Sequence, residues 1–377
     1  MSLTAPALFR NLLDPDLFAA KEFSTDYIDW LITAGLGPIA HAGIKRSGTN
    51  IPAKDMEKLL AVSLSGRFCS SNRAQGLSLI LEQAGPDNGI GLLKGILFAH
   101  NFYNEPHFRP MGDIDLLVTP EKLTTTVELL LDLGAEQKAL EDAAYFDDHH
   151  HLMPFHMKDQ DILIEVHTGL FPSRSGLAGP GPFDPENIHK LTQATKFFDK
   201  PVLALNNEMQ FFHTTVHWAE EFRRIGGMFG LIDFYLLMQK VQNELDWDWI
   251  FSRSNNRAHI APAQLAISYL ERAELISEPA DIRSALKNRG KLCASALRTL
   301  NTIIDNYIVL GKPPGALMSN ANLLTTWKTA LHSGNNMLYL AKTLWNVAFP
   351  EEEADRFTLN FQLERFRNAQ TRLKKHH

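Results

Sequence analysis

Two carboxylates two residues apart, Asp113 and Asp115, are the side chains of this sequence best placed to do chemistry. The run around them is apolar, which predicts a buried strand, and side chains two apart on a strand point to the same face. Neighbouring carboxylates repel each other and are costly to bury, and a hard cation such as Mg²⁺ relieves both costs. The pair therefore predicts a metal site, although two acids on the solvated face of an edge strand are an alternative.

A third carboxylate, Glu165, lies in the middle of a second apolar strand predicted over residues 161–167. Three carboxylates on neighbouring strands can hold the two cations of a phosphoryl-transfer site. The glycine before the first pair, Gly112, lets backbone or substrate approach the start of that strand closely. The alternative for Glu165 is a surface acid on a hairpin.

Several further residues could bind phosphate. Gly95 is predicted to begin a helix after a strand, where free backbone N–H groups and the helix dipole favour phosphate. Lys94 beside it could act as a point charge for that phosphate, or could be an ordinary solvated lysine. Arg109 could pair with an aspartate or with a triphosphate, unless it is a surface arginine. Arg223 and its neighbour add positive charge, with Asp233 as a partner for one of them.

Two histidine clusters suggest metal binding less directly. Residues 147–151 read Asp-Asp-His-His-His, and such strings bind transition metals. Side chains alternate along an extended segment, so at most His149 and His151 are expected to converge, and we interpret the string as a solvated strand entrance. His213 and His217 have the spacing of metal ligands on a helix, but their aromatic neighbours favour a role in packing or in lining a cleft.

Composition restricts the class of protein. The 377 residues are too many for one ordinary core, and contents of 45% hydrophobic and 21% charged residues are typical of globular proteins. A net charge of −6 argues against binding to long nucleic acid. Two cysteines far apart, no apolar run of roughly 18–20 residues and no secretory signal indicate a cytoplasmic protein without a membrane span.

The hydrophobic pattern indicates an α+β protein with three parts: an N-terminal helical segment over residues 1–85, an α/β core over 86–205 and a C-terminal helical domain over 206–377. The predicted elements are helices over 7–17, 27–34, 55–64 and 73–84, a strand from 90 turning into a helix over about 96–104, the strand at 113–118, a helix from Pro120 that ends at Gly134, a hairpin of 150–157 and 161–167, and a Pro/Gly-rich loop over 172–185.

The motifs at residues 93–95, 109–118 and 164–167, taken as a set, resemble the uncharacterised nucleotidyltransferase family of the polymerase-beta-like superfamily. The stretch from His217 to residue 249 is similar to the helical half of that family. The resemblance implies a small mixed β-sheet flanked by helices, in which Asp113, Asp115 and Glu165 hold two Mg²⁺ ions, or Mn²⁺. The wider superfamily has Gly-Ser where this chain has Lys94-Gly95.

The resemblance implies transfer of a nucleoside monophosphate from an NTP to an acceptor hydroxyl, on a small molecule or a protein, with release of pyrophosphate. The catalytic and metal-binding residues would be Asp113, Asp115 and Glu165, and the nucleotide-binding residues would be Lys94, Gly95, Arg109, His167 and Arg223. An inactive nucleotide-binding module on the same fold and a metal-dependent phosphohydrolase that uses the histidine string remain the alternatives.

Overall fold

The fold is taken from a computed structural model, which describes residues 4–14, 23–138, 146, 149–172, 175, 177–178, 181–221, 227–253, 257–277, 286, 289, 292–312 and 320–348. Within these ranges no helix combines the length and the apolar character that crossing a membrane requires.

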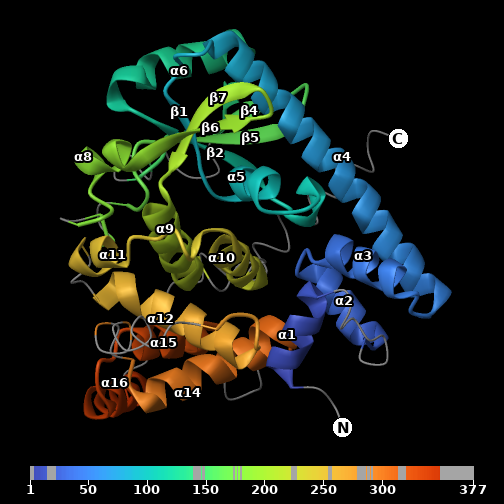
Figure 1. The fold of residues 1–377 in the computed structure, drawn as a ribbon, viewed down its shortest axis with the longest axis vertical. Coiled ribbons are helices and arrows are strands. Elements are labelled where there is room, and N and C mark those ends of the chain that lie inside the picture. The colour runs from blue at the N-terminus through green and yellow to red at the C-terminus, as the bar shows by residue number, and fades with distance from the viewer. Residues whose placement is uncertain are drawn as a thin grey trace.

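A seven-stranded mixed sheet forms the centre of the α/β part (Figure 1), in the order β3-β4-β5-β2-β1-β7-β6. Its strands are β1 (Ile90–Leu92), β2 (Asp113–Val118), β3 (Glu136–Gln137), β4 (Phe155–Met157), β5 (Ile162–His167), β6 (Thr192–Phe197) and β7 (Lys200–Leu205). Strand β2 runs parallel to β5 and antiparallel to β1, and β1 runs parallel to β7. The α+β class is confirmed.

The strand that carries the aspartate pair and the following hairpin are confirmed. Strands β4 and β5 pair antiparallel with Met157 opposite Ile162, so the predicted turn at residues 158–160 joins them. The first strand of the hairpin is shorter than predicted, because only an isolated bridge from His151 to His167 precedes it. The hairpin of β6 and β7 was not predicted, since β6 lies at the sheet edge and four of its six side chains are polar.

Among the described residues, the helices that precede the sheet are α1 (Ala5–Leu13), α2 (Thr25–Thr33), α3 (Gly37–Ser47) and α4 (Ala53–Ala84). The prediction of two helices separated at residues 70–72 is wrong, because α4 is one helix of 32 residues. Ser and Asn are only weakly unfavourable inside a helix, and burial near both ends of α4 outweighs that cost. Leu59 packs into the core of the helical half, and Leu77 packs under the sheet.

Shorter elements connect the strands: α5 (Lys94–Asn101), the 3₁₀ turn η2 (Pro106–Phe108), α6 (Pro120–Asp132), α8 (Pro185–Ile188) and the 3₁₀ turn η4 (His189–Leu191). Gly134, with φ +78°, follows the end of α6 as predicted. Only part of the predicted Pro/Gly-rich loop lies among the described residues.

The described chain after Asn206 is helical, as predicted. It forms α9 (Asn207–Glu221), α10 (Gly227–Val241), α11 (Trp247–Arg253), α12 (Arg257–Arg272), α14 (Ala294–Ile303), the π-helical turn η5 (Ile304–Val309), α15 (Asn320–Leu331) and α16 (Asn336–Ala348). These helices lie below the sheet in Figure 1.

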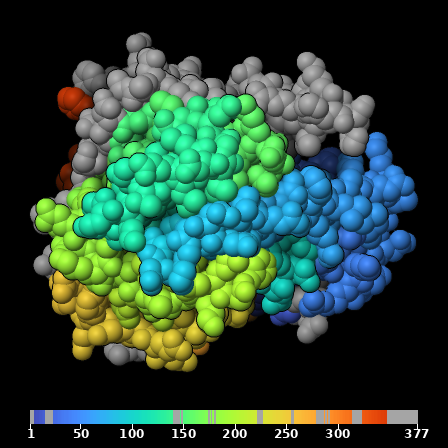
Figure 2. All heavy atoms as spheres, turned by 90° about the horizontal axis from the view of Figure 1, so that it is seen from above, coloured from blue at the N-terminus to red at the C-terminus, as the bar shows by residue number. Residues whose placement is uncertain are grey.

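Two hydrophobic cores organise the molecule. One lies between the sheet, α4 and α6, and the other joins α1, α2 and α3 to the C-terminal helices. Phe9 packs edge-on against Tyr269 at 6.0 Å between ring centroids, and Trp30 Nε1 donates a hydrogen bond to the carbonyl of Val309. Helix α4 therefore spans from one core to the other, and it crosses the face seen in Figure 2. The division into three domains at residues 85 and 205 stays a prediction.

Helices α9 and α10 approach so closely that Gly230 leaves no room for a side chain. A Cβ there would lie 2.3 Å from Trp218 Cδ1, and Trp218 is fixed by a 2.8 Å hydrogen bond from Nε1 to the carbonyl of Gly227. Gly230→Ala should lower the free energy of unfolding by about 1–3 kcal/mol through overpacking, measured by urea denaturation. Gly66→Ala in α4 is the control, since its Cβ would meet only ordinary contacts at 3.6 Å. Equal stabilities for both variants would contradict the packing argument.

Acid should destabilise the protein through His259 of α12. Burial lowers the pKa of His259 from 6.5 to about 4. Between these values the unfolded chain binds a proton that the folded chain does not, so the free energy of unfolding falls as the pH drops from about 6.5 to 4. The shift corresponds to about 3 kcal/mol. His259→Gln should flatten this part of the stability curve, and a curve of unchanged slope would rule out the assignment.

Candidate functional site

The turn from β1 into α5 places Lys94 against the central aspartate. Lys94 has φ +46°, a conformation that costs a non-glycine residue about 1–3 kcal/mol and is common at functional sites. The Leu93 amide donates a hydrogen bond to the carbonyl of Asp115 at 3.1 Å, which fixes this turn on β2. The Lys94 ammonium then lies 3.1 Å from Asp115 Oδ1.

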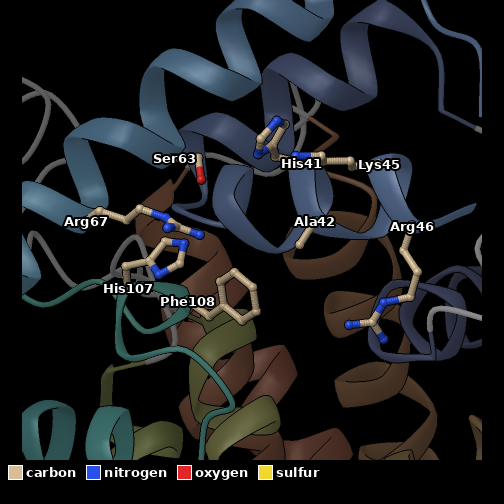
Figure 3. A pocket seen from close by; sticks show the side chains of 8 residues that line it. All are labelled: His41, Ala42, Lys45, Arg46, Ser63, Arg67, His107 and Phe108. Carbon is tan, nitrogen blue, oxygen red and sulfur yellow. The ribbon is translucent and has the colours of Figure 1, made fainter. Parts of the chain in front are cut away.

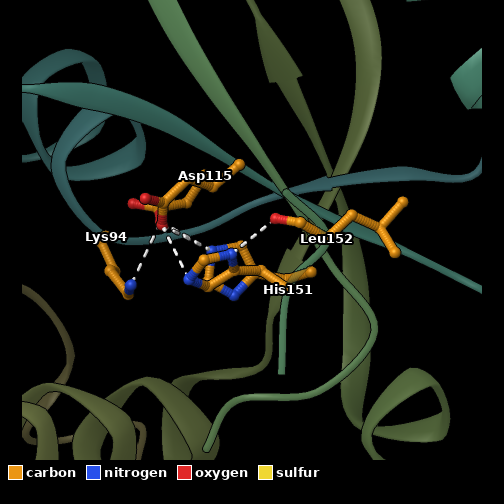
Figure 4. A network of polar contacts seen from close by, with 6 residues as sticks. Lys94, Asp115, His151 and Leu152 are labelled. Atoms are coloured by element: carbon orange, nitrogen blue, oxygen red, sulfur yellow. Dashed lines mark hydrogen bonds and ion pairs between the residues drawn. The ribbon is translucent and has the colours of Figure 1, made fainter. Parts of the chain in front are cut away.

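Parallel pairing of β2 with β5 sets Asp115 directly beside Glu165. His167 lies two residues further along β5 and therefore shares the face of Glu165. Its Nε2 is 2.8 Å from Asp115 Oδ1 and 3.6 Å from Glu165 Oε2. The structure thus brings together four of the predicted residues, Lys94, Asp115, Glu165 and His167. Figure 4 shows the approach of Lys94 to Asp115.

Charge compensation keeps this buried cluster ionised. Burial acts to raise the pKa of Asp115, but the Lys94 ammonium and the hydrogen bond from His167 lower it overall. Burial is the largest single effect on Glu165 and acts to raise its pKa, but the contacts with His167, His151 and Lys94 together lower it overall. For His167, burial and Lys94 oppose protonation, whereas its contacts with Asp115 and Glu165 raise its pKa overall. Both carboxylates are therefore charged at neutral pH.

His151 adds a nitrogen that the sequence analysis did not assign to the site. Its Nδ1 lies 2.7 Å from the carbonyl of Leu152 and must donate to it, because a carbonyl oxygen only accepts (Figure 4). Burial lowers the pKa of His151, so the ring is neutral and Nε2 carries a lone pair. This Nε2 lies 3.6 Å from Glu165 Oε2. Two acceptors that face each other at this distance favour a cation between them.

The histidine string converges, contrary to the prediction that at most two of its rings would do so. Ligand nitrogens of His149, His150 and His151 lie within 4.8 Å of one another, and the ring centroids of His150 and His151 are each 5.1 Å from that of His167. The interpretation as a solvated strand entrance is wrong for His151, which is buried, whereas His149 and His150 are half-buried. Side-chain alternation fails here because residues 149 and 150 form a bend rather than a strand. Asp147 and Asp148 lie outside the described residues.

Asp113 occupies the same face of β2 as Asp115, two residues nearer the start of the strand, and is half-buried. In the described part of the chain, Asp115, Glu165 and His167 bring their ligand atoms within 4.8 Å of one another. Asp113 is not a member of this group. The role of Asp113 as a metal ligand stays a prediction.

Gly95 is also required by packing. A Cβ at this position would lie 3.0 Å from Met111 Cβ, so a larger residue would displace Met111.

Arg109 does pair with an aspartate, and the partner is Asp233 of α10. Its Nε lies 3.0 Å from both carboxylate oxygens of Asp233, and its Nη2 lies 2.9 Å from Oδ2. Tyr103 donates a hydrogen bond to the same carboxylate at 2.7 Å, and the Arg109 guanidinium stacks 5.0 Å from the ring centroid of Phe229. The arginine that precedes β2 therefore ties this strand to the helical half. Arg223 lies outside the described residues.

The carboxylates and the His151 imidazole fit a divalent metal. Asp115 and Glu165 offer oxygens, and His151 offers a nitrogen, a donor set that suits Mn²⁺ and other transition ions in addition to Mg²⁺. His213 of α9 is buried, and burial lowers its pKa far below the usual value. Its ring packs against Phe171 and His217, as its aromatic neighbours predicted.

The pairing of Arg109 with Asp233 should be a major contribution to stability. Asp233→Ala leaves a buried guanidinium without its counter-charge, and we expect the free energy of unfolding to fall by about 3–5 kcal/mol. Arg109→Ala should cost a similar amount by urea denaturation. The double variant should lose clearly less than the sum of the two, because the penalty of one unpaired charge then disappears. Additive losses would mean that the contact contributes little.

Comparison with protein-family models identifies the family. A family described as uncharacterised nucleotidyltransferase matches residues 24–273, which include both strands of the cluster and α9, α10, α11 and α12. No curated protein and no solved structure matches the chain. The match covers more than half of the sequence, and it agrees with the family indicated by the aspartate pair and the Glu165–His167 motif. The chain therefore belongs to this uncharacterised nucleotidyltransferase family.

Proposed function

We propose that the protein transfers a nucleoside monophosphate from an NTP to a hydroxyl group of a small molecule or a protein, and releases pyrophosphate. The observation that carries this proposal is the pair of ionised carboxylates of the buried Asp115 and the half-buried Glu165, in register on parallel strands beside Lys94. The acceptor oxygen forms a bond to the α-phosphorus while the bond to the pyrophosphate oxygen breaks. In such reactions a protein mainly positions the reactants and neutralises charge.

Each residue of the cluster has a proposed role. Asp115 and Glu165, together with Asp113, hold divalent Mg²⁺ or Mn²⁺, which neutralises the phosphate charge and polarises the reacting oxygens. His167 orients the carboxylate of Asp115 through its 2.8 Å contact. Glu165 accepts the proton of the attacking hydroxyl. Lys94 and the backbone of Gly95, at the first turn of α5, bind the phosphates of the NTP, which requires Lys94 to leave Asp115.

The other parts of the chain have proposed roles as well. Residues 206–377 form a helical domain that selects the acceptor, residues 86–205 form the catalytic core, and residues 1–85 support it. The net charge of −6 favours a small or protein acceptor over long nucleic acid. We propose that the protein acts in the cytoplasm.

The contact between Lys94 and Asp115 also supports a second candidate, an inactive nucleotide-binding module. A lysine that neutralises Asp115 performs part of the electrostatic task of a metal, and this chain has Lys94-Gly95 where the superfamily has Gly-Ser. Convergence of His149, His150 and His151 favours a third, a transition-metal phosphohydrolase.

Thermal denaturation with ATP, GTP, CTP or UTP, with and without Mg²⁺ or Mn²⁺, tests the proposal. A nucleotide at one hundred times its dissociation constant should stabilise the native protein by about 2.7 kcal/mol. This gain should require the metal and should disappear in Asp115→Asn, which removes a charged ligand without changing volume. Asp159→Asn, an exposed acid in the turn before β5, is the matched control.

Pyrophosphate release then separates the candidates. Metal-dependent nucleotide binding without pyrophosphate release against any hydroxyl acceptor would favour the inactive module. Activity with Mn²⁺ or Zn²⁺ that is lost in His149→Ala and His151→Ala but kept in Asp115→Asn would favour the phosphohydrolase. Stabilisation by an NTP that persists in Asp115→Asn would contradict the proposed site.

A further inference from the structure

A cavity of about 250 Å³ lies between α3, α4 and η2, and cationic side chains dominate its lining (Figure 3). Lys45 and Arg46 come from α3, Arg67 comes from α4, and His107 comes from η2, whose chain leads six residues later to Asp113. Three side chains that are charged at every physiological pH therefore gather at one opening.

This positive charge has little compensation within the protein. Among the residues that the structure describes, none of Lys45, Arg46 and Arg67 forms an ion pair with a carboxylate. The nearest acid contact is that of Glu105, whose Oε2 lies 3.7 Å from His107 Nδ1. The proximity of Arg67 contributes to lowering the pKa of His107, although burial contributes more. An anion in the cavity would balance these charges.

The cavity also offers buried hydrogen-bonding groups. His107 is 4% exposed, and its Nε2 is buried without a hydrogen-bond partner among the described residues. Ser63, which is also 4% exposed, lines the same space with its hydroxyl. In Figure 3 the Arg67 guanidinium lies over the imidazole of His107. A buried polar atom without a partner is costly, so a ligand that hydrogen-bonds to it stabilises the site.

We propose that this cavity binds a small phosphate-bearing molecule. A phosphate group carries close to two negative charges and accepts several hydrogen bonds, which matches a cavity lined by guanidinium, ammonium and hydroxyl groups. The ring of Phe108 and the methyl group of Ala42 provide an apolar wall for the remainder of an organic phosphate. The volume suits a small ligand rather than a polymer.

The site is distinct from the carboxylate cluster, and no residue is shared between them. The two are nevertheless linked through the chain, since η2 continues through Arg109 into β2. A ligand that bridges α3, α4 and η2 would brace the segment that leads to Asp113.

Isothermal titration calorimetry without divalent metal tests the proposal, with inorganic phosphate, pyrophosphate and AMP as probes at constant ionic strength. We expect saturable binding of at least one probe to the full chain, weakened at least about tenfold in Arg67→Gln, because a charge-assisted hydrogen bond is lost. Tighter binding of AMP than of phosphate would identify an organic phosphate as the ligand, and the reverse order would identify the inorganic ion.

Variants decide whether binding occurs in this cavity. Lys45→Gln should weaken it as Arg67→Gln does, and both residues are exposed enough for the fold to tolerate the change. Lys54→Gln, which removes one charge from an exposed position of α4, should leave affinity unchanged. No saturable binding, equal affinity in Arg67→Gln and Lys54→Gln, or loss of binding in Asp115→Asn would each overturn the proposal. Because no metal is present, failure here leaves the nucleotidyl-transfer proposal standing.

Discussion

Asp115 and Glu165 face each other because β2 and β5 pair in parallel with these two residues in register. Side chains on a strand alternate with a period of two, so a slip of one residue would turn one carboxylate to the opposite face. Buried apolar side chains next to the acids, such as Ile114 and Ile164, prevent that slip. A slip would turn these apolar side chains toward the site and would bury a carboxylate in the core. The hydrophobic pattern of the two strands thus also sets the distance between the acids.

Two carboxylates side by side, one of them buried, require cations, and the chain provides these from two directions. Lys94 reaches Asp115 from the first residue of α5, where it adopts a left-handed conformation that glycine usually occupies. His167 donates from the neighbouring strand. A glycine would adopt this conformation at lower cost but would leave Asp115 without the Lys94 ammonium, so the ion pair offsets the conformational cost at Lys94.

Local patterns predicted the elements that carry the acids, because short-range rules determine them: an apolar run with acids two apart, a turn at residues 158–160, and a helix that begins at Pro120. Features that depend on tertiary contacts were not predictable. Helix α4 passes through residues with weak helix propensity since both of its ends are buried, and β6 is a polar edge strand. The convergence of His149, His150 and His151 on one another arises from an irregular bend, to which no period applies.

The strand that holds the carboxylates is positioned by the helical half as much as by its own sheet. Arg109 ties the entry of β2 to Asp233 of α10, and its guanidinium stacks on Phe229. The turn after α2 packs against the residues around this ion pair. A Cβ at Gly35 would lie 3.0 Å from Phe229 and 3.1 Å from Pro110. N-terminal helices, α10 and the entry of β2 therefore meet around one ion pair. A shift of α10, or of the N-terminal helices, must move the start of β2, so the helical parts and the carboxylate cluster form one mechanical unit.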